Sequence, residues 1–240
     1  GKYEHMVEVE YVYQEVETLP IEKRNPKRTA LYGSVRAVLM GRDLIDGPFG
    51  VINAVNFYQK ESFELLYEHL QKLQDSDYSS VNVCFRLANV LAKSAGVTRG
   101  ICEVDENGYL ISVTDRLGVE RVGGIPMFPN EVHKWEQLDE NSFVSMNMWG
   151  FMPSIFDQMQ VAFDHFLDDY GKDMKAHYSI PTFMNNQIEK GMKVKVVETP
   201  ARWMGLVSHD DKIQVVLRIN EMMRKGVYPS KLFEVNDKDI

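Results

Sequence analysis

Hydrophobic and polar positions follow two periods along the chain, and the period separates strands from helices. A period of two over residues 7–13 predicts a strand, and apolar residues spaced by three and four over residues 61–73 predict a helix. The same reasoning predicts further strands at 49–53, 81–85, 101–104, 109–113, 143–149 and 194–197, and further helices at 35–45, from Pro153, at 180–190 and from Ser208 to Gly226.

The order of these elements indicates the fold class. Strands that alternate with helices predict an α/β protein with a mixed, mostly parallel Rossmann-like sheet flanked by helices. Asn107-Gly108, a favoured tight-turn pair, predicts one inserted β-hairpin. Residues 118–131, which are rich in glycine and proline, are expected to form an exposed excursion. We expect residues 1–240 to form a single domain.

Composition excludes several classes of protein. The net charge of -8 argues against nucleic acid as a partner, because nucleic-acid-binding domains usually present a basic surface. No apolar run approaches the ~20 residues of a membrane span, and no signal-peptide pattern occurs, so no membrane partner and a cytoplasmic location are expected. Cys84 and Cys102 lack metal-ligand spacing and are expected to be buried thiols rather than a disulfide.

The loop 53–58 is the first candidate for chemistry. It follows the strand 49–53, and in open α/β sheets ligands collect just past the carboxyl ends of strands. A second candidate is the basic loop 22–28, which can be solvated or lie near phosphates. The six histidines show no metal or catalytic spacing, and no pairing of a nucleophile with a base is visible.

Several segments, in order, resemble the sugar-1-phosphate nucleotidyltransferase family. The segments are VEYVYQE (9–15), GSVRAV (33–38), NAVNFY (53–58), RGICEVDENGYL (99–110), SMNMWGF (145–151) and ARWMG (201–205) followed by Asp211-Lys212. The resemblance covers about residues 3–233. It implies a sheet of the nucleotide-diphospho-sugar transferase type, and transfer of a nucleotidyl group from an NTP to a sugar 1-phosphate with Mg²⁺ as cofactor.

The resemblance also implies roles for individual residues. Asp115 and Arg116 can equally form a surface ion pair, Trp149 can equally pack in the core, and Asp211 can instead cap a helix that begins near Ser208. The residues implied are Gly33, Ser34, Arg36 and Asn53 for the nucleotide, Asp115, Arg116, Asn147, Trp149 and Gly150 for the sugar, and Asp211 for the metal.

Three departures from the family pattern bear on activity. Val55 and Asn56 occupy the two acidic positions of the central loop, and a valine cannot ligate Mg²⁺. The family's first Gly-rich loop, which holds the triphosphate, has no counterpart. Arg36 replaces a Gln or His that faces the base, and arginine cannot accept a hydrogen bond. These departures predict an N-terminally shortened, degenerate protein that has little or no catalysis but keeps part of a nucleotide or sugar cleft.

Two alternatives remain open. The chain can be an active Mg²⁺-dependent sugar-phosphate nucleotidyltransferase that is completed by a separate N-terminal chain or a missing segment. It can also be a structural module that forms a homo-oligomer through the exposed edge of strand 7–13. The expected small-molecule partners are an NTP, a sugar 1-phosphate or an NDP-sugar.

Overall fold

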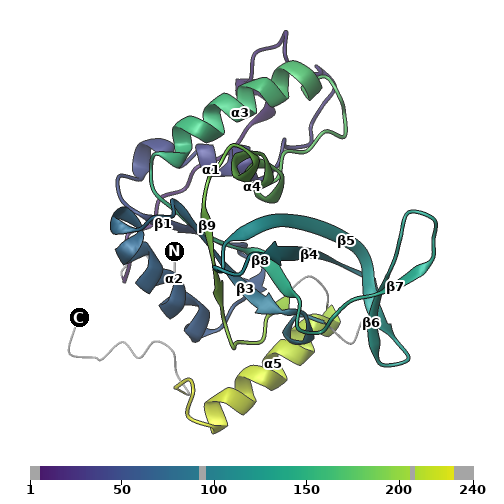
Figure 1. The fold of residues 1–240 in the computed structure, drawn as a ribbon. Coiled ribbons are helices and arrows are strands. Elements are labelled where there is room, and N and C mark those ends of the chain that lie inside the picture. Colours follow the sequence, from purple (N-terminus) through teal and green to yellow (C-terminus); the bar gives the residue numbers. More distant parts are fainter. Residues whose placement is uncertain (1–5, 92–95, 206–208, 230–240) are drawn as a thin grey trace.

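The computed structural model describes residues 6–91, 96–205 and 209–229, and its centre is one curled sheet (Figure 1). The strand order is β7-β6-β5-β4-β8-β3-β9, and β1 pairs with β8 in addition. The bounds of these strands are Phe49–Val51 (β1), Ser80–Arg86 (β3), Val97–Val104 (β4), Leu110–Val122 (β5), Ile125–Pro129 (β6), Trp135–Gln137 (β7), Phe143–Phe151 (β8) and Val194–Glu198 (β9).

The sheet is mixed but mostly antiparallel, so the prediction of a mostly parallel sheet is wrong. Among the described strands of this sheet, only β3 and β9 pair in parallel. The predicted hairpin is confirmed as β4 and β5, with Gly108 at a φ of 77° in its turn. Residues 118–131 continue this meander through the end of β5 and through β6, rather than forming an irregular excursion. The period within a strand does not reveal the direction of its neighbours.

Helices cover both faces of the sheet. Helix α1 (Ser34–Leu39), α3 (Ile155–Tyr170) and α4 (Ile180–Glu189) pack on one face, and α2 (Lys60–Lys72) packs on the other. The predicted helices at 61–73, from 153 and at 180–190 are confirmed. The predicted helix 35–45 is shorter than expected and gives way to a 3-10 turn at Arg42–Leu44. Gly150 lets α2 approach closely, because a Cβ there would lie 3.0 Å from carbons of Leu66 and Leu70.

The predicted first strand is absent from the described structure. Residues 7–13 pair with no described strand, and Val7 and Tyr13 are 59% and 75% exposed. The alternation of side chains is real, but a strand also needs a neighbour that accepts its backbone hydrogen bonds. Dimerisation through these residues therefore loses its structural premise of an edge strand and stays a prediction.

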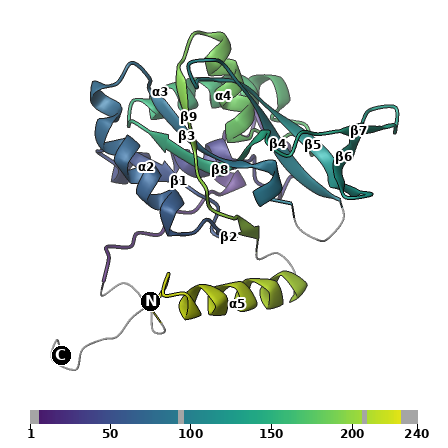
Figure 2. The same ribbon diagram turned by 60° about the horizontal axis from the view of Figure 1, so that its bottom comes forward.

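The last helix, α5 (His209–Arg224), lies beneath the rest of the fold (Figure 2). It follows a small two-stranded sheet formed by β2 (Asn56–Phe57) and β10 (Met204–Gly205). Beyond the helix, the Tyr228 hydroxyl accepts a hydrogen bond from the Lys60 amide at 2.8 Å. Ser208, the predicted cap, lies outside the described residues. Within the described ranges, no helix has both the length and the apolar character to cross a bilayer.

Candidate functional site

Strand β8 changes its neighbour half way along one edge. Val51 of β1 pairs with Trp149, whereas Gly100 of β4 pairs with Ser145, and β3 occupies the other edge of β8 at both places. Between these two pairings, residues 146–148 bulge opposite the single residue Val83 of β3. We call the place where β1 leaves β8 and β4 joins it the β8 junction. The carboxyl end of β1 lies at this junction, and ligands of α/β folds collect just past the carboxyl ends of strands.

Asn147 lies at the centre of the β8 junction. Its φ of 58° is in the left-handed region, which asparagine tolerates better than most residues. Its side-chain oxygen Oδ1 accepts a hydrogen bond from the Trp149 indole at 3.3 Å, and its Nδ2 makes no hydrogen bond to any described residue. A backbone in this region at a sheet junction is typical of functional positions. Asn147 is therefore the side chain of β8 best placed to donate to a ligand.

Tyr58 ties the loop 53–58 to the β8 junction. Its buried hydroxyl accepts hydrogen bonds from the Asn53 amide at 3.1 Å and from Asn56 Nδ2 at 3.0 Å, and it donates to the Met146 carbonyl at 2.8 Å. Burial raises the pKa of the Tyr58 phenol, although the hydrogen bonds from Asn53 and Asn56 oppose the shift. The predicted loop and the predicted sugar-binding strand are thus brought together by a residue that the sequence analysis did not single out.

Tyr58→Phe tests this arrangement. The variant keeps the ring but leaves the Asn53 amide and the Met146 carbonyl without this partner, which costs about 1–3 kcal/mol per buried polar group left unsatisfied. We expect urea unfolding to show a loss of about 2 kcal/mol. Tyr67→Phe on the following helix α2 is the control, because Tyr67 is exposed and its substitution should change stability by less than about 0.5 kcal/mol. Equal losses in the two variants would contradict a role for the Tyr58 hydroxyl.

A row of polar groups continues from the β8 junction across the sheet. Asn82 donates to the Ser145 hydroxyl at 3.1 Å and accepts from the Cys84 thiol at 2.6 Å. Asp115 pairs with Gly100 across β4 and β5, and its Oδ1 would lie 3.4 Å from a Cβ at Gly100. The missing side chain of Gly100 therefore leaves the Asp115 carboxylate beside the strand that carries Ser145.

The two cysteines take part in this row as thiols. Cys84 and Cys102 are buried and free, with their sulfur atoms 3.8 Å apart, which confirms the prediction of buried thiols. Burial raises the pKa of Cys84 well above its ordinary value, so this thiol stays protonated and serves as a hydrogen-bond donor.

The other predicted sugar-site residues take part mainly in packing. The Trp149 side chain is fully buried and stacks on Phe151 at 6.2 Å between ring centroids, so core packing is the correct reading. Gly150 faces α2 on the opposite side of the sheet. Arg116 packs its guanidinium over the ring of Phe128, 4.9 Å from the centroid. No ion pair between Asp115 and Arg116 is present in the described structure.

The predicted nucleotide-binding residues of α1 make their contacts with other helices and not with the β8 junction. Ser34 Oγ accepts a hydrogen bond from the Ile180 amide at 2.9 Å, at the start of α4. Arg36 lies over the ring of Phe163 at 5.7 Å and reaches Thr18, and burial lowers its pKa. Its Nε is buried without a hydrogen-bond partner among the described residues. Of the predicted nucleotide set, only Asn53 makes its contacts at the junction.

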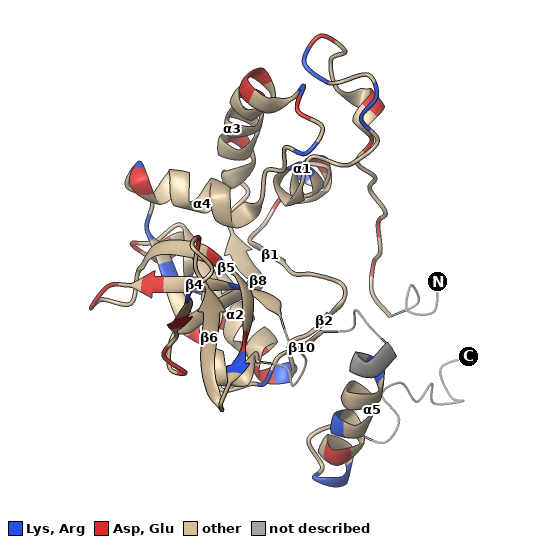
Figure 3. Cartoon of the chain, turned by 90° about the vertical axis from the view of Figure 1, so that its right-hand side faces the viewer, with Lys and Arg blue, Asp and Glu red and all other residues tan. Residues whose placement is uncertain are grey.

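The loop 47–59 and strand β8 do not supply a carboxylate for Mg²⁺. Mg²⁺ is usually bound through one or two carboxylates together with phosphates and water. Residues 47–59 and strand β8 carry no acidic residue, and these segments are tan in Figure 3. Val55 is 52% exposed and offers no ligand atom. Among the described residues, no group of three potential metal ligands occurs. The side chain of Asp211, the predicted metal ligand, lies outside what the structure describes.

Arg28 shows what sequence reasoning missed in the basic loop. Its side chain is 3% exposed and donates to four carbonyls, those of Ala30 (2.7 Å), Leu31 (2.9 Å), Asp173 (2.7 Å) and Ala176 (2.7 Å). The guanidinium also lies 3.9 Å from the centroid of the Tyr32 ring. Arg28 is therefore neither solvated nor free to bind phosphate. No periodic pattern predicts this role of Arg28, because two of its four partners are backbone carbonyls 145 and 148 residues away.

Arg99 is a second buried arginine of this kind. It begins the RGICEVDENGYL segment and donates to the carbonyls of Val90 and Thr98, with its guanidinium over the Trp203 ring. Burial lowers its pKa to about 10. The arginine of this segment thus packs against Val90, Thr98 and Trp203, and no contact with Asn147 or Tyr58 is present among the described residues.

Comparison with known proteins relates this geometry to a fold. No protein-family model and no curated protein sequence matches the chain. The chain is similar in structure to the inositol-1-phosphate CTP transferase of T. maritima, with a TM-score of 0.50 and 10% identity over 81% of this chain and 64% of that one. A Bacillus anthracis protein described as a glucose-1-phosphate thymidylyltransferase gives a TM-score of 0.48 at 11% identity, over 82% of this chain and 63% of that one.

The likeness to the T. maritima protein concerns the fold. At 10% identity it shows that the chain has an α/β fold similar to that of this transferase, with a curled mixed sheet and helices. The chain spans just under two thirds of the length of each of these proteins.

Proposed function

We propose that the chain binds a nucleotide or a sugar at the β8 junction and catalyses little or no nucleotidyl transfer. The observation that carries the proposal is the set of groups at the junction. Asn147 supplies an amide whose Nδ2 is free among the described residues, and Asp115 supplies a single carboxylate one strand farther from β8. The loop residues Asn53 and Asn56 are bonded to Tyr58 through a backbone N–H and through Nδ2. Amides and a lone carboxylate suit the hydroxyl groups of a sugar or a ribose, since a hydroxyl can donate to the carboxylate and can donate to or accept from an amide.

The same set of groups explains the expected loss of catalysis. Nucleotidyl transfer depends on neutralising phosphate charge, which a bound metal ion supplies at several kcal/mol, and each ~1.4 kcal/mol is a factor of ten in rate. With Val55 and Asn56 in place of carboxylates, the described junction offers no comparable charge. Binding through amides does not require the metal, so a cleft can keep its ligand after losing the chemistry.

A thermal-shift series tests both parts of the proposal. The chain is heated with each common NTP and NDP-sugar, with and without Mg²⁺. A ligand at about a hundred times its Kd adds ~2.7 kcal/mol, which raises the Tm of a domain of this size by about 5–11 °C. We expect a shift that is independent of Mg²⁺ and is lost in Asn147→Ala. Absence of any shift would refute the cleft, and NDP-sugar synthesis by the unmodified chain with Mg²⁺ would refute the lack of catalysis.

A second candidate is an active enzyme completed by a further polypeptide segment. The observation in its favour is that β1 pairs only with β8 in the described structure, which leaves the other edge of β1 open to a strand. This candidate predicts Mg²⁺-dependent product formation when such a segment is expressed together with the chain. Val55→Asp should increase that activity. If neither condition yields product, the second candidate fails while the binding proposal stands.

A further inference from the structure

A cavity of about 500 Å³ lies between α3 and α4, apart from the β8 junction. It is bounded by the C-terminal half of α3, by one side of α4 and by the connection between the two helices. Its lining includes none of the junction residues. The principal polar and aromatic residues of its wall are His165, Asp169, Tyr170, His177, Asn186 and Lys190. Its volume falls within the range of about 300–1,000 Å³ found for small-molecule sites.

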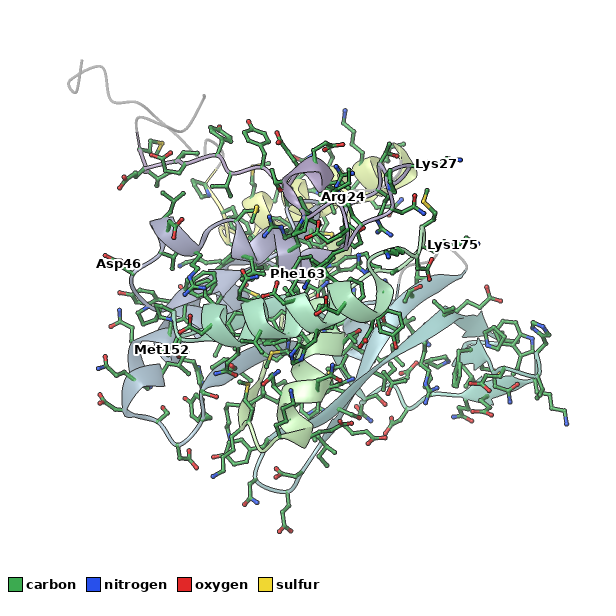
Figure 4. All side chains as sticks on the ribbon, turned by 90° about the horizontal axis from the view of Figure 1, so that it is seen from above. Arg24, Lys27, Asp46, Met152, Phe163 and Lys175 are labelled. Carbon is green, nitrogen blue, oxygen red and sulfur yellow. The ribbon has the colours of Figure 1, made fainter. Side chains whose placement is uncertain are left out.

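Hydrogen bonds from Arg28 of the basic loop and from Tyr32 hold the connection between α3 and α4, which forms part of the cavity wall. Arg28 holds the carbonyls of Asp173 and Ala176, and the Tyr32 hydroxyl donates to the carbonyl of Gly171 at 2.6 Å. Figure 4 shows Lys27 of the basic loop and Lys175 of the connection at the same end of α3. A wall held in this way is preformed, so a ligand does not have to order it on binding.

An aromatic stack supports the other side of the connection. The Tyr178 ring stacks on Phe166, with 4.9 Å between centroids and 6° between planes, and the Tyr178 amide donates to the Tyr32 carbonyl at 2.8 Å. Tyr170 contacts the same stack through Phe166 and remains 56% exposed. The cavity therefore presents an accessible aromatic side chain at a rigid wall.

The polar groups that face the cavity have free hydrogen-bonding capacity. The side chains of His165, Asp169, His177 and Lys190 form no hydrogen bond or ion pair with any described residue. Asn186 makes only a long contact, 3.5 Å from its Nδ2 to the Tyr178 hydroxyl. Acceptors, donors and groups that can do both are thus distributed around one preformed space.

We propose that this cavity binds a neutral saccharide. The carboxylates of Asp169 and Asp173 outnumber the one ammonium group of Lys190, which disfavours a phosphate, and Lys190 itself disfavours a polyamine. A sugar ring presents dense hydroxyls that donate to a carboxylate and accept from an ammonium or an amide. Its flat apolar face matches the exposed ring of Tyr170. The proposal does not rest on the function proposed for the β8 junction.

Saturation-transfer NMR on the intact chain tests the proposal, with D-glucose, D-mannose and maltose each as the probe. We expect transfer to at least one sugar, reduced at least five-fold in Asp169→Ala and in Asn186→Ala. Both residues are exposed, so both variants should fold. Transfer should persist in Glu189→Gln, which alters an exposed carboxylate of α4 outside the cavity lining.

The other outcomes each overturn the proposal. No transfer to any of the three sugars would remove the saccharide. Transfer that survives both cavity variants, or that disappears in Asn147→Ala instead, would place sugar binding elsewhere. Displacement of the sugar by equimolar inorganic phosphate would show an anion site in place of a site for neutral sugars.

Discussion

Arg28→Lys is expected to lower the free energy of unfolding by about 3 kcal/mol, the scale seen when one partner of a buried charged interaction is removed. Lysine keeps the positive charge but cannot reproduce the planar fork that reaches four carbonyls in different directions. The carbonyls of Asp173 and Ala176 would lose a charged donor. The connection between α3 and α4 would then no longer be hydrogen-bonded to Arg28 of the basic loop. For a domain of this size, the loss corresponds to a fall in Tm of about 6–12 °C.

Arg42→Lys is the matched control for this prediction. Arg42 forms an exposed ion pair with Asp157, and exposed pairs contribute about 0–1 kcal/mol. Urea unfolding at neutral pH should therefore separate the two arginine variants clearly. If Arg28→Lys unfolds like Arg42→Lys, the four hydrogen bonds do not hold the connection in place, and the cavity wall beside it is not preformed.

The sequence predicts helices and central strands of this protein well, because their side chains carry the signal. The α2 stripe, the apolar residues Val81, Val83 and Phe85 of β3 and the Asn107-Gly108 turn each encode their element locally. Whether two strands pair in parallel or antiparallel is not encoded in this way. The alternation over residues 7–13 satisfies the strand pattern equally well, but pairing requires a second segment, and none of the described strands accepts it.

Candidate site residues could be predicted from the sequence where the residue type does not fit the local pattern. Asn147 was a candidate because a polar side chain in an apolar strand needs a partner, and the structure places it at the β8 junction with a left-handed φ. Tyr58 was not a candidate, since a tyrosine at the end of an apolar loop has no special pattern. Its role depends on a carbonyl 88 residues away. For Arg36, the sequence predicts the position on a helix but not the contact with Phe163.

Gly33→Ala is expected to be the most destabilising single change at the start of α1, at about 4 kcal/mol. Gly33 has a φ of 110°, and a Cβ there would lie 2.5 Å from the carbonyl oxygen of Tyr178. The left-handed backbone costs about 1–3 kcal/mol for a residue with a side chain, and forcing an extra carbon against fixed backbone atoms costs about 1–3 kcal/mol more. The Tyr178 backbone cannot retreat easily, because its amide is bonded to Tyr32 and its carbonyl to Val35.

Gly191→Ala separates the two costs. Gly191 has a similar φ of 95°, but a Cβ there would meet no atom within 4 Å, so this variant measures the backbone cost alone. Chemical unfolding should show Gly33→Ala to be less stable than Gly191→Ala by about 2 kcal/mol, which is the cost of the close approach to Tyr178. Equal losses would mean that Tyr178 moves aside. Gly33 would then not be needed for helix packing, and the nucleotide role implied by the family resemblance would become the better account of a glycine at this position.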